Sequence, residues 1–378
     1  MGPEGFWNPF QIGYAGRDTR AMRTTQPRLP DATSHSAGPR KDMTDRNIAP
    51  RQARHLFLQS KKGTVKQSSY RAYRFPTRHF TEHLEAQRID SMREVDGFHI
   101  ENWKVARRSE NIAPATLKSN VKHVATYLRW CERTNIVQAG LGEKIEIPNI
   151  AIEDEASHKR VSHERSLQIR NYLSTFEYGT RQHALFALLW ETGCRISGAI
   201  SLDLGDFSPD EKRLEFHDRK DTGTALKNGT KGERNLTLSD DLIRVLTDYV
   251  GVQRHDVCDD FNRKPLFTTK NGRVTRQRVY KNVVGFTRPC IYKNTCPHGK
   301  DIERCEAAQK KKKAYDCPSS TSMHPVRRGS ITYHLNQGWP KEKVSERCDV
   351  SIDVLDKHYN EQTKEDERAT RKKYIDRL

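Results

Sequence analysis

Two stretches near the end of the chain carry side chains that suit chemistry on a phosphate. His324 and Arg327 stand three residues apart, so a helix places both on one face. Tyr359 follows after enough chain for two helices and a turn to bring its hydroxyl beside that pair. A tyrosine side chain can form a covalent intermediate. The spacing predicts Tyr359 as a nucleophile toward a phosphate held by His324 and Arg327.

Two further cations precede this pair. Arg195 lies where one predicted helix stops at Thr192-Gly193 and another starts, so its planar guanidinium can direct paired hydrogen bonds at a phosphate. A capping or salt-bridged arginine is the alternative. Lys227 lies in a turn between two predicted strands, where a lysine can donate a proton to a departing alkoxide. Lys231 is the reserve, and a solvated turn is the alternative.

Helices are the elements that must position these side chains. Apolar and aromatic residues recur at helical spacing before residue 150, and Pro114 suits an early helix position. Later helices are predicted over 166–176, 184–190, 240–250 and 273–286, and strands over 213–218, 234–239 and 265–269. The expected fold class is mainly α with a small antiparallel β-sheet.

Shifts in composition divide the chain into domains. Residues 1–50 are rich in Gly, Pro, Arg, Ser and Thr and are expected to form a disordered arm. Residues 51–149 are expected to form a helical DNA-binding domain, with a purely structural helical domain as the alternative. Residues 150–163 are expected to form a linker, and residues 164–378 a catalytic domain.

The charge balance favours a polyanionic partner. Lys and Arg number 67 against 49 Asp and Glu, a formal net charge of +18 over 378 residues. Basic side chains that neutralise phosphates release counterions and so supply affinity for nucleic acid. The mean hydropathy is −0.90, and neither a membrane-spanning run nor a signal peptide is evident. The sequence predicts an intracellular protein that binds double-stranded DNA and no membrane.

The order of these motifs resembles that of the tyrosine recombinases, the phage integrase family, and in particular the integrase-like proteins of archaeal viruses and plasmids. The resemblance covers roughly residues 53 to 360. It is carried by Thr-Gly-Cys-Arg-Ile-Ser at 192–197, Lys-Asn-Gly-Thr-Lys-Gly-Glu-Arg at 227–234, His-Pro-Val-Arg-Arg-Gly-Ser at 324–330 and Val-Leu-Asp-Lys-His-Tyr at 354–359. The combination is specific, whereas each motif alone is not.

The resemblance implies a function and a role for each residue. Arg195 and Arg327 hold the scissile phosphate, His324 assists binding and proton transfer, Lys227 protonates the 5′-hydroxyl leaving group, and Tyr359 becomes the 3′-phosphotyrosine. The residues before the linker resemble that family's core-binding domain. No cofactor is expected for catalysis, and assembly as a homo-oligomer on DNA, a tetramer, is expected by analogy.

Departures from the family pattern leave alternatives open. Gly198 stands where many relatives have an acid, and Val350, directly after Asp349, stands where the family has a second His or a Trp. Tyr333 is the rival nucleophile, although its position six residues after Arg327 favours a core aromatic. Other functions are a non-catalytic DNA-binding regulator of the same fold and a metal-dependent nuclease, for which the sequence offers no carboxylate cluster.

A cysteine-rich insertion is predicted at about 288–320. Four of the eight cysteines fall there: Cys290, Cys296, Cys305 and Cys317. Four thiolates, or three with His298, can hold a tetrahedral structural zinc ion. Free thiols in a basic loop are the alternative.

Overall fold

The computed structural model describes residues 47–150, 159–359, 368 and 372. The predicted arm at 1–50 and linker at 150–163 fall largely outside these residues. These residues form two compact units, one of residues 47–103 with His123–Glu146, the other of Lys104–Lys122 with the described residues from Ile147 onward. The predicted domain boundaries stay predictions. None of the helices described combines the length and apolar character of a bilayer-crossing segment.

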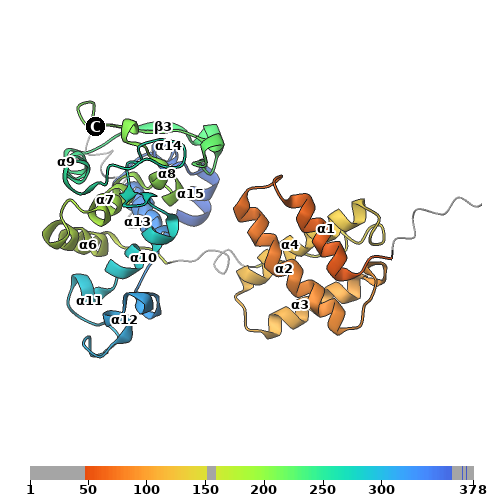
Figure 1. Cartoon of the computed structure of the whole chain (residues 1–378). Helices are drawn as coiled ribbons and strands as arrows, with labels where there is room; N and C mark the ends of the chain where they lie inside the picture. The colour runs from red at the N-terminus through yellow and green to blue at the C-terminus, as the bar shows by residue number, and fades with distance from the viewer. Residues whose placement is uncertain (1–46, 151–158, 360–367, 369–371, 373–378) are drawn as a thin grey trace, which may run out of the picture. The chain divides into compact units, whose positions relative to one another are not determined.

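The N-terminal part of the chain is helical, as its apolar spacing predicts, and its helices are labelled in Figure 1. They are α1 (Pro50–Lys61), α2 (Gln67–Ala86), the short η1 (Met92–Glu94), α3 (Gly97–Ser109) and α4 (Pro114–Arg133). Aromatic side chains fill the core of the first unit, with Phe57 5.1 Å from Tyr127 and Phe80 5.4 Å from Trp103 between ring centroids. Each of these four side chains is fully buried. Their burial is the main favourable term that holds the helices together.

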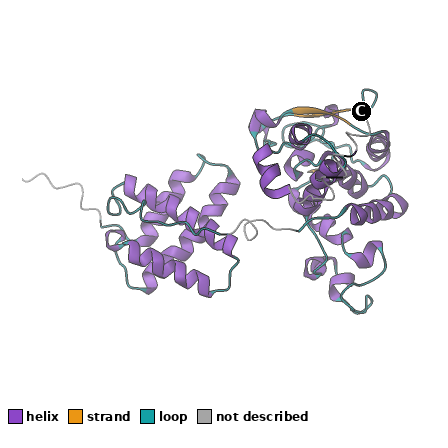
Figure 2. Cartoon of the chain, turned by 180° about the vertical axis from the view of Figure 1, so that it is seen from behind, coloured by secondary structure: helices purple, strands orange, loops and turns teal. Residues whose placement is uncertain are grey.

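The second unit is again mostly helical, with two small sheets (Figures 1 and 2). Its helices are α6 (His163–Phe176), α7 (Arg181–Thr192), α8 (Ile196–Ser201), α9 (Asp240–Asp248), α10 (Arg276–Phe286), α11 (Pro289–Tyr292), α12 (Glu306–Gln309), α13 (Met323–Asn336), α14 (Lys341–Cys348) and α15 (Ile352–Tyr359). Short η turns join several of them, and η5 (Tyr249–Gln253) is a π-helix. Side-chain N-caps at Ser162, Thr180, Ser239 and Thr275 start four of the helices.

The strands form antiparallel pairs, as predicted. Strand β2 (Arg213–Phe216) pairs with β1 (Phe207–Ser208) on one side and β3 (Arg234–Thr237) on the other, with Leu214 opposite Leu236. A second pair joins β4 (Thr268–Thr269) to β5 (Gly272–Arg273). The predicted fold class, mainly α with a small antiparallel β-sheet, is confirmed.

Helices α7 and α13 pack against each other at the centre of the second unit. Small residues allow this: Ser330 Oγ donates to the Trp190 carbonyl, and a Cβ on Gly329 would lie 2.0 Å from the Val161 carbonyl oxygen. The Val161 amide donates to the Pro325 carbonyl at 3.1 Å. The segment that leads into α6 is therefore held against the helix that carries His324 and Arg327.

Candidate active site

A sharp corner between α7 and α8 presents Arg195. Helix α7 ends at Gly193, which has a left-handed backbone (φ 57°), and Arg195 is the N-cap residue of α8. A Cβ on Gly193 would lie 2.7 Å from the Cys348 sulfur, so only glycine lets the corner approach the end of α14. The predicted corner is therefore present, and it lies against a segment far away in the sequence.

Arg195 and Arg327 converge on the same stretch of backbone. Arg327 Nη1 donates to the carbonyls of Gly193 and Cys348, each at 2.6 Å, and its Nη2 donates to the Asp349 carbonyl at 3.3 Å. Arg195 Nη1 donates to that same Asp349 carbonyl and pairs with the Asp349 carboxylate. Burial and the neighbouring Arg327 lower the pKa of Arg195, while the charge of Asp349 opposes that shift. The two guanidinium groups form one cationic site.

His324 and Lys227 lie beside these arginines. His324 is in the first turn of α13, and part of the residue is exposed to solvent. Partial burial lowers the pKa of His324, and the positive charges of Arg328, Arg327, Lys227 and Arg195 lower it further. The imidazole is thus biased toward its neutral form, which can both accept and donate a proton.

Tyr359 ends α15 within the same neighbourhood. Its side chain is 4 % exposed and packs in a cluster with Cys348, Val350 and Leu355, among others. The guanidinium of Arg328 lies 5.7 Å from the centre of its ring, and Tyr359 also acts electrostatically on Arg195. The structure therefore brings all five predicted residues together, while their catalytic roles stay predictions.

No family model matches the chain. It is 28% identical over 121 residues to tyrosine recombinase XerC of Herpetosiphon aurantiacus, covering 32% of this chain and 36% of that relative. A Tn1549 transposon integrase in complex with circular intermediate DNA superposes with a TM-score of 0.61 at 13% identity, over 86% of this chain and all of that one. A lambda integrase dimer bound to a core site gives a TM-score of 0.60 at 9% identity, over 85% and 80% of the two chains.

The chain has the tyrosine recombinase fold. The resemblance predicted from the sequence motifs is therefore confirmed. The narrower likeness to proteins of archaeal viruses and plasmids stays a prediction. The chain spans about a third of the length of the curated relative it matches, 36%.

Within the tyrosine recombinase fold, three polar residues at the site were missed as functional candidates. Asn228 Nδ2 donates to Asp349 Oδ1 at 2.6 Å. Arg234 donates to the Arg347 and Gly232 carbonyls and stacks over Phe216. Arg328 is 6 % exposed, and its Nε and Nη1 meet no acceptor in the described part of the chain. All three lie within the motifs quoted at 227–234 and 324–330, but their spacing alone does not show which way they face.

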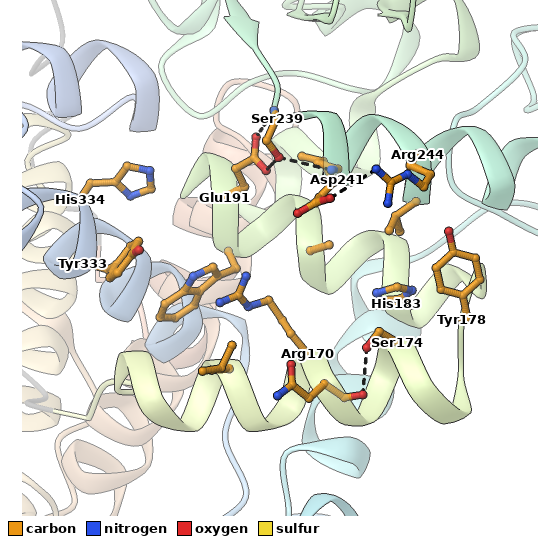
Figure 3. Close-up of a pocket in the computed structure, with 16 residues that line it drawn as sticks. Arg170, Ser174, Tyr178, His183, Glu191, Ser239, Asp241, Arg244, Tyr333 and His334 are labelled. Carbon is orange, nitrogen blue, oxygen red and sulfur yellow. Dashed lines mark hydrogen bonds and ion pairs between the residues drawn. The ribbon is translucent and has the colours of Figure 1, made fainter.

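The rival nucleophile Tyr333 faces a different part of the recombinase fold. It stacks on His163 with 4.3 Å between ring centroids and lines a pocket of about 420 Å³ between α6, α7, α9 and α13 (Figure 3). Arg170, Trp190 and Glu191 also line this pocket, and none of the five predicted catalytic residues does. Tyr333 is thus placed as a partly buried aromatic at the edge of the core.

The cysteine-rich insertion of the recombinase fold gathers its four cysteines and His298 around one small cavity. All four cysteines are free thiols, and His298 Nε2 lies 2.9 Å from Ser319 Oγ. Among the residues described, no group of three or more His, Cys, Asp or Glu is arranged to hold a metal ion. The predicted zinc site therefore receives no support from the geometry, and no role is derived for zinc.

Proposed function

We propose that the chain is a site-specific DNA recombinase or integrase that cuts and rejoins DNA through a 3′-phosphotyrosine intermediate. One observation carries the proposal: Arg195, Lys227, His324, Arg327 and Tyr359 lie together although they come from four separate motifs. The tyrosine recombinase fold supports the same reading.

Each residue has a role in the proposed cleavage. Arg195 and Arg327 neutralise the non-bridging oxygens of the scissile phosphate as charge develops on them. The Tyr359 oxygen attacks phosphorus and forms the phosphotyrosine bond while the bond to the 5′ oxygen breaks. Lys227 gives its proton to that oxygen, and the neutral His324 helps to bind the phosphate and to transfer the tyrosine proton. A 5′-hydroxyl attacks in the reverse sense to rejoin the strand, because one phosphodiester has replaced another.

The partners follow from the same proposal. Double-stranded DNA is the substrate, and the net charge of +18 supports affinity for its phosphates. Strand exchange between two duplexes requires several protomers, so a tetramer on DNA is proposed, with the protein acting inside the cell. The helical first unit contributes phosphate contacts through its exposed Lys and Arg side chains.

A nicked suicide substrate tests the proposal. The substrate is a duplex bearing a direct repeat from the DNA that flanks the gene, nicked close to the cleavage position so that the released strand diffuses away. We expect a covalent protein–DNA adduct that resists denaturant, persists in EDTA and is lost in Tyr359→Phe. The matched variant Tyr333→Phe keeps the adduct. Binding without any adduct points instead to a non-catalytic DNA-binding regulator.

A further inference from the structure

Asp349 occupies an unusual position at the end of α14. It caps the helix in the left-handed region (φ 53°, ψ 61°), a conformation that aspartate tolerates better than most residues. Its side chain is 13% exposed. Val350, directly after it, is buried in the apolar cluster with Tyr359 and cannot replace the imidazole or indole that the family pattern has there. Asp349 is therefore the polar group at this end of the site.

Asp349 is hydrogen-bonded to three residues of the site. Its carboxylate pairs with Arg195 Nη1 through Oδ2 and accepts from Asn228 Nδ2 through Oδ1 at 2.6 Å. Its carbonyl accepts from Arg195 Nη1 and from Arg327 Nη2. Asn228 directly follows Lys227, so one residue joins both arginines to the loop that carries the lysine.

The surrounding glycines are consistent with this arrangement. A Cβ on Gly232 would lie 3.3 Å from Asp349 Oδ2, so the glycine leaves room for the carboxylate. A Cβ on Gly198 would lie 3.3 Å from a ring carbon of Phe216 and 4.0 Å from Leu226. An acid at 198 would therefore point into apolar side chains, where a charge is costly. The carboxylate that supports Arg195 must come from elsewhere.

We infer that Asp349 is a positioning residue of the recombination site, which holds Arg195 and the Lys227 loop in register with Arg327. This inference rests on the proposed function. Both hydrogen bonds from Arg195 to Asp349 come from Nη1, so the other edge of that guanidinium can receive the phosphate. A fixed carboxylate also keeps the guanidinium from collapsing onto other acceptors before DNA arrives, which preorganises the cationic site.

The test compares Asp349→Asn with the wild type in single-turnover adduct formation. Asn keeps the shape and tolerates the left-handed backbone but removes the charge. Asp353→Asn, at an exposed acid on α15, is the control with the same change in net charge. We expect Asp349→Asn to slow the adduct step by up to about 10²-fold, the scale of a displaced catalytic group, with unchanged DNA affinity. Asp353→Asn leaves the rate unchanged.

Two further measurements separate positioning from general loss of structure. With a methylphosphonate at the scissile position the phosphate carries no negative charge, so the defect of Asp349→Asn shrinks, as does that of Arg195→Ala. In the Arg195→Ala background, Asp349→Asn adds no further loss, because the two substitutions remove one shared interaction. An additive loss, or a defect of equal size on the neutral substrate, contradicts the inference.

A gain of function in Asp349→Asn would overturn the inference. If Asp349 instead occludes the site as a stand-in for the phosphate, Asp349→Asn binds DNA more tightly or forms the adduct faster than wild type, and the inference is overturned. Hydrogen exchange of the DNA-free protein tests Asp349 without relying on catalysis. Asp349→Gly, which suits the left-handed backbone, is expected to lower amide protection over 226–234. If the wild type forms no adduct, the proposed function fails and this measurement alone decides whether Asp349 holds the loop.

Discussion

The candidate active site and the cysteine-rich insertion both gather reactive side chains, but they are stabilised differently. At the site, Arg327 is 5 % exposed and its hydrogen bonds reach segments that are far apart in the sequence. Within residues 290–320, Ala314 is the single buried side chain. Arg165 of α6 donates to the Tyr292 hydroxyl and the Ser319 carbonyl of the insertion, and Arg288 donates to the Gly285 and Ala308 carbonyls. A packed core thus fixes the proposed chemistry, whereas the insertion is held by a few hydrogen bonds and by the packing of Ile291 and Tyr292 against the core.

The largest effect is expected when a buried arginine in each region is replaced with lysine. Arg327→Lys loses the planar group that spans the Gly193 and Cys348 carbonyls and that is proposed to bind the scissile phosphate. We expect single-turnover adduct formation to fall by about 10²–10³-fold, the range for loss of one preorganised donor. Arg288, also buried, donates to the Ala308 and Gly285 carbonyls, and Arg288→Lys is expected to leave the rate unchanged. Equal losses would show that the two regions are not separable.

Two helical glycines, one near the site and one before the insertion, differ in how closely they are packed. Alanine in place of a helical glycine normally stabilises a protein by up to about 1 kcal/mol. At Gly329 the new Cβ would lie 2.0 Å from the Val161 carbonyl oxygen, and at Gly285 it would meet nothing within 4 Å. We expect Gly329→Ala to lower the free energy of unfolding by about 1–3 kcal/mol, as overpacking does, and Gly285→Ala to raise it slightly. Urea denaturation of both variants measures the two signs.

The pH dependence tests the cationic character of the site. The lowered pKa of His324 means that the unfolded chain takes up a proton more readily than the folded protein. Its contribution to stability is present above the ordinary value of 6.5 and is lost as the pH falls through 6.5 toward the folded pKa. Melting temperatures between pH 5 and 8 are expected to fall more steeply below 6.5 for wild type than for His324→Gln. A steeper fall for the variant would reverse the sign.

The insertion alone is expected to become more flexible when Arg288 loses its hydrogen bonds. Arg288→Lys cannot span the Ala308 and Gly285 carbonyls together, so limited proteolysis should cleave faster within 290–320 while the fragments of the remaining chain stay unchanged. Cleavage that appears at the same time in α7 or α13 would mean that the insertion supports the central core.

The smallest expected effect is that of EDTA on the reactivity of the cysteine thiols. Cys131, Cys194 and Cys348 are buried, and burial raises the pKa of Cys348 to about 11. The five other cysteines are at least partly exposed. We expect these five to react with a thiol reagent in the native protein, with EDTA making no difference. Protection of the four insertion cysteines that EDTA abolishes would instead support the zinc ion predicted from the sequence.

Local sequence signals predicted much of the fold. Gly193 after an apolar helix, Pro114 at a helix start and the alternating strand residues around 213 and 234 place elements where the structure has them. The arrangement around Asp349 was out of reach, because its partners at 195, 228 and 327 are joined only by tertiary packing. The four insertion cysteines line one small cavity, but the metal site predicted from their count requires side-chain directions that sequence spacing does not define.

The contact between Val161 and α13 has a mechanical consequence. The amide of Val161 is bound to the Pro325 carbonyl and its own carbonyl is seated against Gly329, on either side of Arg327. A displacement of Val161 would therefore act directly on the helix that carries Arg327. The segment just before α6 and the helix of His324 and Arg327 are thus expected to move together.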